Sequence, residues 1–214
     1  MQAKANFSWE RFETLPVIGI LRGLTGKQIL QTAEVYQKVG FSTLEVTMNT
    51  QGAAEIISQL STSFPNLNIG AGTVCDMEDL DTAKNAGASF IVTPILDIKL
   101  IKACRDSGLP VFPGAYTPTE VFQAWRAGAS AVKVFPASQL GPRFIKDLLA
   151  PLNKIRLVPT GGVSKSNIKA YFEAGVTGVG MGSSLFPRSM VEGENLKKLE
   201  DHLRSVKDEV QLYR

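Results

Sequence analysis

The 214-residue sequence predicts a (β/α)8 barrel, a TIM-barrel fold, and three observations favour that class. Short apolar runs rich in β-branched residues alternate with longer helical patterns. Eight such runs begin roughly 20 to 26 residues apart, the length of a strand, a helix and two short loops. Phrases such as NAGASFIVTP and RAGASAVKVFP resemble one another, so one strand–helix unit recurs along the chain.

The predicted strands are short and nearly continuous in apolar residues, as parallel strands are when helices cover the sheet. They are Val17–Leu21, Thr43–Thr47, Asn68–Gly72, Phe90–Thr93, Pro110–Pro113, Ala131–Phe135, Arg156–Pro159 and Gly178–Met181. Glycines 40, 87, 128 and 175 each stand between a helical pattern and the next strand. A helix that ends in left-handed backbone favours glycine at that point, so these residues are expected to end four of the helices.

A further helix at about Trp9–Leu15 is expected to plug the N-terminal end of the barrel. The alternative arrangement of the same units is an open, doubly wound sheet. Eight evenly spaced units favour closure, and no GxGxxG follows the first strand as a dinucleotide fold would require. No linker or low-complexity segment interrupts the chain, so we expect one domain over residues 1–214.

The composition argues against several classes of protein. Hydrophobic residues make up 44%, charged residues 20%, and the net charge of +3 is spread out, with no basic block that indicates nucleic acid. No apolar run is long enough for a membrane span, and the first residues lack a secretory signal, so a cytoplasmic protein is expected. The single histidine, His202, rules out a zinc site built on several histidines and argues against a Ser-His-Asp triad.

Two charged residues lie in strands whose neighbours are apolar. Lys133 alternates with two valines that should face the helices, so its side chain is expected to point into the barrel. Glu45, between a leucine and a valine, follows the same rule. Burial and a nearby cation such as Arg22 lower a lysine pKa, which would make Lys133 a nucleophile with Glu45 as its proton-transfer partner. A structural ion pair between Lys133 and Glu45 is the alternative.

Two Gly-rich loops predict an anion site at the C-terminal ends of the last two strands. PTGGV contains Gly161 and Gly162, and GMGSSLF contains Gly182, Ser183 and Ser184. In barrels these two loops often bind phosphate through backbone N–H groups. Tight loops need glycine for conformational reasons as well, so it is the pairing of the two loops that favours phosphate.

With these residues placed, the sequence resembles the KDPG/KHG aldolase family, which acts on 2-dehydro-3-deoxy-6-phosphogluconate and 4-hydroxy-2-oxoglutarate. The resemblance runs from Pro16 to about Phe186. The matching stretches include ILR at 20–22, LEVT at 44–47, GAGTV at 70–74, FIVTP at 90–94, VKVFPA at 132–137, PTGGV at 159–163 and VGMGSSL at 179–185. The resemblance implies a class I aldolase, homotrimeric, that needs no metal or other cofactor and releases pyruvate from a phosphorylated 2-oxo sugar acid.

The resemblance also implies roles for individual residues. Lys133 would form the Schiff base and Glu45 would move protons through a water. The substrate would contact Arg22 and Thr73 at its carboxylate, Pro94 and Phe135 at the pocket floor and wall, and Gly161, Gly162 and Ser183, with the adjoining Gly182, at its phosphate. Asn49 departs from members that carry arginine there, so carboxylate binding should rest more on Arg22.

Several substrates and functions remain open at this point. The galactonate-derived epimer and the unphosphorylated 4-hydroxy-2-oxoglutarate, which would give pyruvate and glyoxylate, fit the same chemistry. A non-aldolase phosphate-binding barrel enzyme and a catalytically silent binding module are the alternatives outside it, and neither predicts an imine at Lys133.

Overall fold

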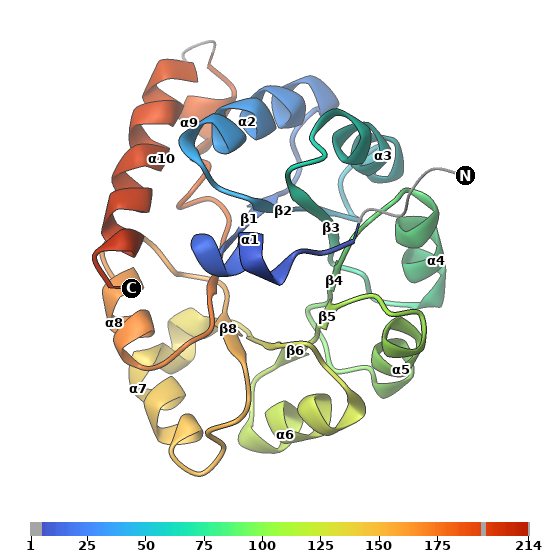
Figure 1. The fold of residues 1–214 in the computed structure, drawn as a ribbon, viewed down its shortest axis with the longest axis vertical. Coiled ribbons are helices and arrows are strands. Elements are labelled where there is room, and N and C mark those ends of the chain that lie inside the picture. Colours follow the sequence, from blue (N-terminus) through green and yellow to red (C-terminus); the bar gives the residue numbers. More distant parts are fainter. Residues whose placement is uncertain (1–5, 194–195, 214) are drawn as a thin grey trace.

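The computed structural model describes residues 6–193 and 196–213, whose strands form a ring surrounded by helices (Figure 1). The strands are β1 Val17–Leu21, β2 Thr43–Thr47, β3 Asn68–Gly72, β4 Ile91–Val92, β5 Val111–Phe112, β6 Gly114–Ala115, β7 Val132–Val134, β8 Leu157–Pro159 and β9 Val179–Met181. The helices are α1 Trp9–Thr14, α2 Gly26–Val39, α3 Ala53–Ser63, α4 Met77–Asn85, α5 Ile98–Asp106, α6 Pro118–Ala127, α7 Ala137–Leu149, α8 Ile168–Glu173, α9 Arg188–Val191 and α10 Leu196–Gln211.

All the strand pairs are parallel, in the orders β5-β4-β3-β2-β1-β9 and β6-β7-β8. The fifth predicted strand is interrupted at Pro113: β5 pairs with β4 before it, and β6 pairs with β7 after it. Proline has no N–H for the ladder, but its carbonyl still accepts from the Lys133 N–H at 2.9 Å. A bridge between Thr160 and Gly180 joins β8 to β9. The predicted (β/α)8 barrel is therefore confirmed, with its fifth strand in two pieces.

Local sequence signals set the helix ends. Thr117 caps α6: its side chain accepts from the Glu120 N–H, while the Glu120 carboxylate accepts from the Thr117 N–H at 2.7 Å. Pro118 occupies the first turn, where its missing N–H costs nothing. The helix ends at Gly128, whose φ of 107° is left-handed, as the sequence predicts. These features place β7, and with it Lys133, directly after α6.

The barrel interior is apolar and aromatic near the N-terminal ends of the strands. Phe12, Phe90 and Phe112 are each fully buried, and the Phe90 and Phe112 ring centroids lie 5.7 Å apart. Phe12 comes from α1, which lies across this end of the barrel in Figure 1, as predicted from Trp9–Leu15. Filling this end with aromatic rings leaves the opposite end, where the strands finish, for polar side chains.

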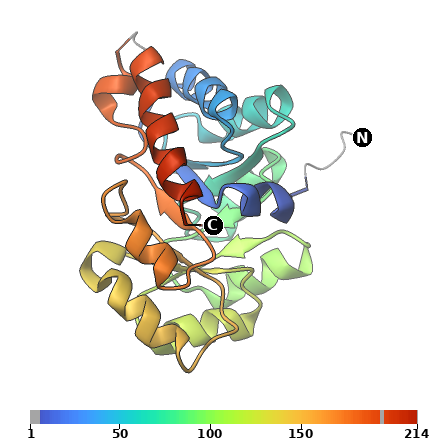
Figure 2. The ribbon, with the colours of Figure 1, turned by 60° about the vertical axis from the view of Figure 1, so that its left-hand side comes forward.

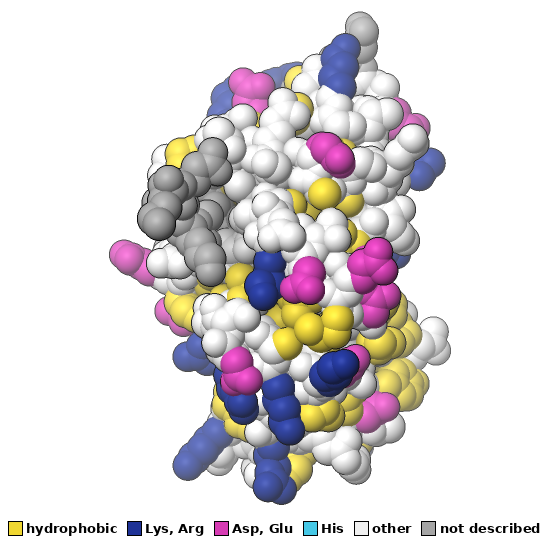
Figure 3. Space-filling model, turned by 90° about the vertical axis from the view of Figure 1, so that its right-hand side faces the viewer, with side chains coloured by type: hydrophobic (Ala, Val, Ile, Leu, Met, Phe, Trp, Pro, Cys, Tyr) yellow, Lys and Arg dark blue, Asp and Glu magenta, His cyan; other side chains and the backbone are white. Residues whose placement is uncertain are grey.

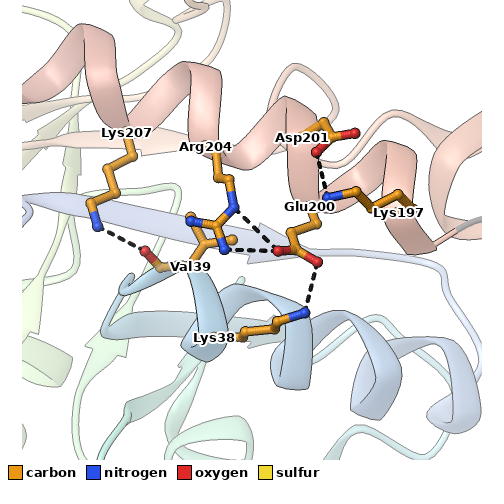
Figure 4. A network of polar contacts seen from close by, with 7 residues as sticks. All are labelled: Lys38, Val39, Lys197, Glu200, Asp201, Arg204 and Lys207. Atoms are coloured by element: carbon orange, nitrogen blue, oxygen red, sulfur yellow. Dashed lines mark hydrogen bonds and ion pairs between the residues drawn. The ribbon is translucent and has the colours of Figure 1, made fainter.

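Helix α10 completes the outer layer and lies along α2 (Figure 2). Glu200 of α10 accepts hydrogen bonds from Lys38 Nζ and Arg204 Nη2, each at 2.8 Å (Figure 4). Lys207 Nζ donates to the carbonyl of Val39 at 2.9 Å. These contacts fix the register of α10 on the barrel. Over residues 6–193 and 196–213, no helix combines the length and apolar character that crossing a membrane requires.

Candidate active site

Lys133 and Glu45 both point into the barrel, as strand alternation predicts. Val132 and Val134 are fully buried in the layer between strands and helices, whereas Lys133, 4% exposed, lines a cavity that opens to solvent. Glu45 is 1% exposed. Strands β2 and β7 lie on opposite sides of the ring, so the lysine and the glutamate approach one another across the interior.

Burial dominates the electrostatics of this pair. Desolvation lowers the pKa of Lys133, and the charge of Arg22 lowers it further, while the Glu45 carboxylate opposes both effects. Desolvation also raises the pKa of Glu45, against the opposing effect of Lys133 and Arg22. Within the described part of the chain, Glu45 Oε2 has no hydrogen-bond partner. The site therefore holds an amine biased towards its neutral form and a carboxyl group suited to proton transfer.

Small residues on the neighbouring strands make room for these side chains. Thr47 pairs with Gly72 in the β2–β3 register, and a Cβ at Gly72 would collide with the Glu45 carboxylate. On the other side of the site, Lys133 Nζ lies 4.8 Å from the centroid of the Phe135 ring, so the ring packs against the amine. Glycine at position 72 thus leaves the space that the Glu45 carboxylate occupies.

A cavity of about 550 Å³ opens above Lys133 at the C-terminal ends of the strands. Of the residues predicted from the sequence, it is lined by Arg22, Lys133, Phe135, Gly161, Gly162, Gly182 and Ser183. The structure thus brings the lysine, the strand-1 arginine and both Gly-rich loops to one space.

Other predicted residues lie at the same end of the barrel but outside the lining of this cavity. Thr73 follows β3 in left-handed backbone, with a φ of 56° that non-glycine residues seldom adopt. Pro94 follows β4 and is half-buried, with its carbonyl against Gly114. Asn49 is exposed in the turn after β2. Glu45 is buried near the cavity without lining it.

The two Gly-rich loops are tied to each other. Gly161 and Gly162 have φ of 87° and 83°, which L side chains rarely adopt, so the loop needs glycine at both places. Ser184 Oγ donates to the Val163 carbonyl at 2.6 Å, and His202 Nε2 lies 2.9 Å from the Ser184 carbonyl. The loops after β8 and β9 therefore form one connected surface at the cavity.

Sequence reasoning missed His202 and Arg188 as parts of this region. His202 follows Leu199 by three residues and precedes Val206 by four, so helical spacing places it beside the buried stripe of α10. Arg188, at the start of α9, lines the cavity. Its position shortly after the last Gly-rich loop could have suggested a place near the cavity. Whether it contacts the cavity depends on how the chain turns after β9.

A buried, electrostatically activated lysine facing a carboxyl group defines a barrel enzyme suited to carbonyl chemistry by a nucleophilic amine. A sequence profile described as KDPG and KHG aldolase matches residues 9–202. The chain belongs to this family, and it is an aldolase, a carbon–carbon lyase.

Individual relatives agree with that assignment. The chain is 33% identical to 2-dehydro-3-deoxy-phosphogluconate aldolase of Haemophilus influenzae, over 93% of this chain and 94% of the relative. It is 37% identical to 2-dehydro-3-deoxy-6-phosphogalactonate aldolase of Escherichia coli, over 80% and 85%. KDPG aldolase of Legionella pneumophila, solved with pyruvate captured as a covalent carbinolamine, is similar with a TM-score of 0.85 and 28% identity, over 92% and 96%.

Proposed function

We propose that this protein is a class I aldolase that cleaves 2-dehydro-3-deoxy-6-phosphogluconate to pyruvate and glyceraldehyde 3-phosphate. The observation that carries the proposal is the inward Lys133, 4% exposed, with its pKa lowered by burial. A buried ammonium would need a strong partner, and the Glu45 carboxyl beside it is itself biased towards its neutral form by burial. A neutral amine facing a cavity is suited to attack a ketone.

The reaction follows from these two groups. Lys133 Nζ adds to C2 of the 2-oxo acid, and Glu45 donates the proton with which the C2 hydroxyl leaves as water. An iminium and the Glu45 carboxylate remain. Glu45 accepts the proton of the C4 hydroxyl through a water, the C3–C4 bond breaks, and its electron pair moves into the iminium to give an enamine. The aldehyde leaves, and C3 of the enamine takes a proton back from Glu45. Water then adds to C2 and gives a proton to the Glu45 carboxylate, and collapse of the carbinolamine releases pyruvate and restores the neutral amine.

The remaining predicted residues hold the substrate in this proposal. Arg22 pairs with the carboxylate, so that C2 lies near the amine, and Thr73 adds a contact to the same group. Pro94 and Phe135 shape the pocket, and exposed Asn49 supplies no charge, which leaves the carboxylate to Arg22. The supporting observation is that Arg22 and Phe135 line the cavity together with Lys133.

The phosphate of the substrate is assigned to the two Gly-rich loops. Gly161, Gly162, Gly182 and Ser183 line the same cavity as Lys133, so one substrate can reach both. Their backbone N–H groups suit an anion because left-handed glycines turn successive N–H groups towards one side.

Reductive trapping tests the assignment of Lys133. Borohydride added with pyruvate should modify the wild-type protein irreversibly, and peptide mass spectrometry should place the adduct at Lys133. Lys133→Met should lose both trapping and cleavage, whereas Lys146→Met, at an exposed lysine of α7, should retain both. Absence of an adduct in the wild type, or an adduct on another lysine, would overturn the proposal.

The galactonate-derived epimer is the second candidate substrate, because a relative with 37% identity is named for it. The unphosphorylated 4-hydroxy-2-oxoglutarate is the third, since the matched profile includes KHG aldolase. Rates of pyruvate release from the three compounds at equal concentration show which substrate the enzyme prefers. If removal of the phosphate leaves kcat/KM unchanged, the phosphate role of Gly161, Gly162 and Ser183 is wrong.

Self-association into a homotrimer is part of the proposal, as the family resemblance implies. Exposed apolar side chains support it: Ile95, Ile98, Tyr116 and Phe122 are 37% to 47% exposed, on or beside α5 and α6. Figure 3 shows hydrophobic side chains gathered over the lower part of one side of the molecule. Light scattering should give three times the monomer mass, and Phe122→Lys should reduce it if this face is the interface. A monomeric wild type would contradict the proposal.

A cytoplasmic location is also proposed. Cys75 is exposed and Cys104 is buried, and both are free thiols, which is typical of reducing compartments. Fractionation of the cells that express the protein should recover it with cytoplasmic markers, and recovery from the cell exterior would contradict this.

A further inference from the structure

The cavity above Lys133 carries an excess of positive charge. The guanidinium groups of Arg22 and Arg188 line it together with the Lys133 amine. Among the described residues in that lining there is no aspartate or glutamate, and Glu45 is buried outside it. A cavity lined in this way favours a ligand with more than one negative charge.

Arg188 reaches this cavity from the outer edge of the phosphate loops. It is the first residue of α9, which begins five residues after Ser183. A Cβ built on Gly23 would lie 3.5 Å from Arg188 Nη2, so the guanidinium lies against the turn after β1. Its side chain therefore crosses from the loop after β9 to the turn that follows Arg22.

The intramolecular partner of Arg188 holds it loosely. Arg188 Nη1 lies 3.6 Å from Glu192 Oε1, one helical turn along, which is longer than a hydrogen bond. The Arg188 side chain is 69% exposed and that of Glu192 48% exposed. Exposed pairs of this kind contribute little to stability, so the guanidinium can exchange this contact for a stronger one.

The charges of the proposed substrate point to that stronger contact. A phosphorylated 2-oxo acid carries a carboxylate at one end and a phosphate at the other, while Lys133 must be neutral to react. Arg22 is committed to the carboxylate in the proposed function. Gly161, Gly162 and Ser183 offer the phosphate only neutral donors, whereas a guanidinium matches it with two charged hydrogen bonds.

We infer that Arg188 is a phosphate-binding residue that determines preference for phosphorylated over unphosphorylated substrates. The inference rests on the proposed function and extends it to a residue outside the Gly-rich loops. Arg188 closes over the phosphate from the β9 side and exchanges its contact with Glu192 for the ligand. It takes no part in the bond-breaking steps at Lys133.

Substrate pairs test this inference. In Arg188→Gln, kcat/KM for the phosphorylated substrate should fall about 10- to 100-fold, the worth of a charge-assisted hydrogen bond. For 4-hydroxy-2-oxoglutarate it should stay within about twofold, because that substrate has no phosphate. Arg188→Lys should recover part of the loss, since lysine keeps the charge without the planar fork.

Two matched variants separate binding from surface effects. Arg143→Gln removes an exposed arginine of α7 that has a similar partner, Asp147 at 3.7 Å, and that lies outside the cavity lining. This variant should leave kcat/KM unchanged for both substrates. Glu192→Gln removes the competing partner of Arg188 and should leave the phosphorylated substrate unchanged or improved. If Glu192→Gln instead reproduces the loss of Arg188→Gln, the ion pair is structural and the inference is wrong.

Inorganic phosphate supplies a readout that does not depend on turnover. Calorimetry should show weaker phosphate binding to Arg188→Gln than to the wild type, by a factor similar to the kinetic loss. If the wild type cleaves the phosphorylated substrate and Arg188→Gln keeps its full preference and phosphate affinity, this inference fails while the proposed function stands. If the wild type forms no imine with pyruvate, the proposed function fails, and phosphate binding still decides the role of Arg188.

Discussion

Gly72→Ala tests whether the position of the Glu45 carboxylate controls proton transfer. Gly72 is buried at the end of β3, and its backbone lies outside the left-handed region, so alanine is tolerated there by the chain itself. The added methyl group would meet Oε1, Cδ and Cγ of Glu45 before any other side chain. The substitution therefore acts on the carboxylate through space, without altering its chemistry.

The size of the displacement follows from the contacts. A Cβ at Gly72 would lie 2.7 Å from Glu45 Cδ, and ordinary contact begins at 3.4 Å, so the carboxyl group must move by a substantial fraction of an ångström. A misplacement of about 1 Å in a catalytic group can cost about 10²-fold in rate. Because the far end of a flexible side chain moves, the stability cost should fall at the low end of the roughly 1–3 kcal/mol seen for overpacked cores.

Exchange of the pyruvate methyl protons in D₂O is the assay that isolates this step. It requires the iminium at Lys133 and proton transfer at C3, but no aldehyde. Gly72→Ala should slow exchange by about 10²-fold while borohydride still traps pyruvate at Lys133. Gly26→Ala is the matched control, since its new Cβ would lie 3.5 Å from Ile56 Cγ1, an ordinary contact.

Equal exchange rates in Gly72→Ala and Gly26→Ala would refute the reasoning. That result would mean that a shifted Glu45 transfers protons as well as the native one, or that another group does so. Loss of trapping together with exchange would also count against it, because the change would then have disturbed Lys133.

Three further predictions follow from buried or paired groups. Glu45→Gln should lower turnover about 10²- to 10⁴-fold and, because the Glu45 carboxylate raises the pKa of Lys133, should shift the acidic limb of imine trapping to lower pH. Hydrogen bonds from Lys38 and Arg204 lower the pKa of Glu200 from 4.5 to about 2. The ionised Glu200 therefore stabilises the folded state fully above pH 4.5, and this contribution is lost as the pH falls towards 2. The Tm difference between Glu200→Gln and wild type should shrink over that range. Phe112→Ala, at a fully buried ring, should lower the free energy of unfolding by about 3–5 kcal/mol in denaturant titrations, and a loss below about 1 kcal/mol would contradict the packed interior.

The strand positions were predictable because hydrophobic periodicity is a local signal. Strands β1, β2 and β3 have the predicted bounds, and the others differ by a residue at their ends. The exception is the fifth strand, where Pro113 interrupts the ladder. The sequence does not show whether a proline ends a strand or interrupts it. That depends on whether the strands on either side pair with the segments before and after the proline.

The candidate site was predictable in part for the same reason. Alternation is enough to turn Lys133 and Glu45 inward, and the rule that barrel chemistry lies at the strand ends then locates Arg22 and the Gly-rich loops. Alternation says nothing about which residues of the outer turns reach the cavity. Thr73, Pro94 and Asn49 lie at the expected end of the barrel but outside the cavity lining, whereas Arg188 lies within it.

By itself, then, the sequence determined the barrel, the inward direction of Lys133 and Glu45, and the two loops that follow β8 and β9. Each of these depends on the period of a strand or on glycine at a turn, which are properties of a few consecutive residues. Only the tertiary structure decided that Gly72 makes room for Glu45, that His202 reaches the Ser184 carbonyl, and that Arg188 faces the turn at Gly23. These contacts join segments far apart in the chain, so they depend on closure of the barrel and on packing of the last helices against it.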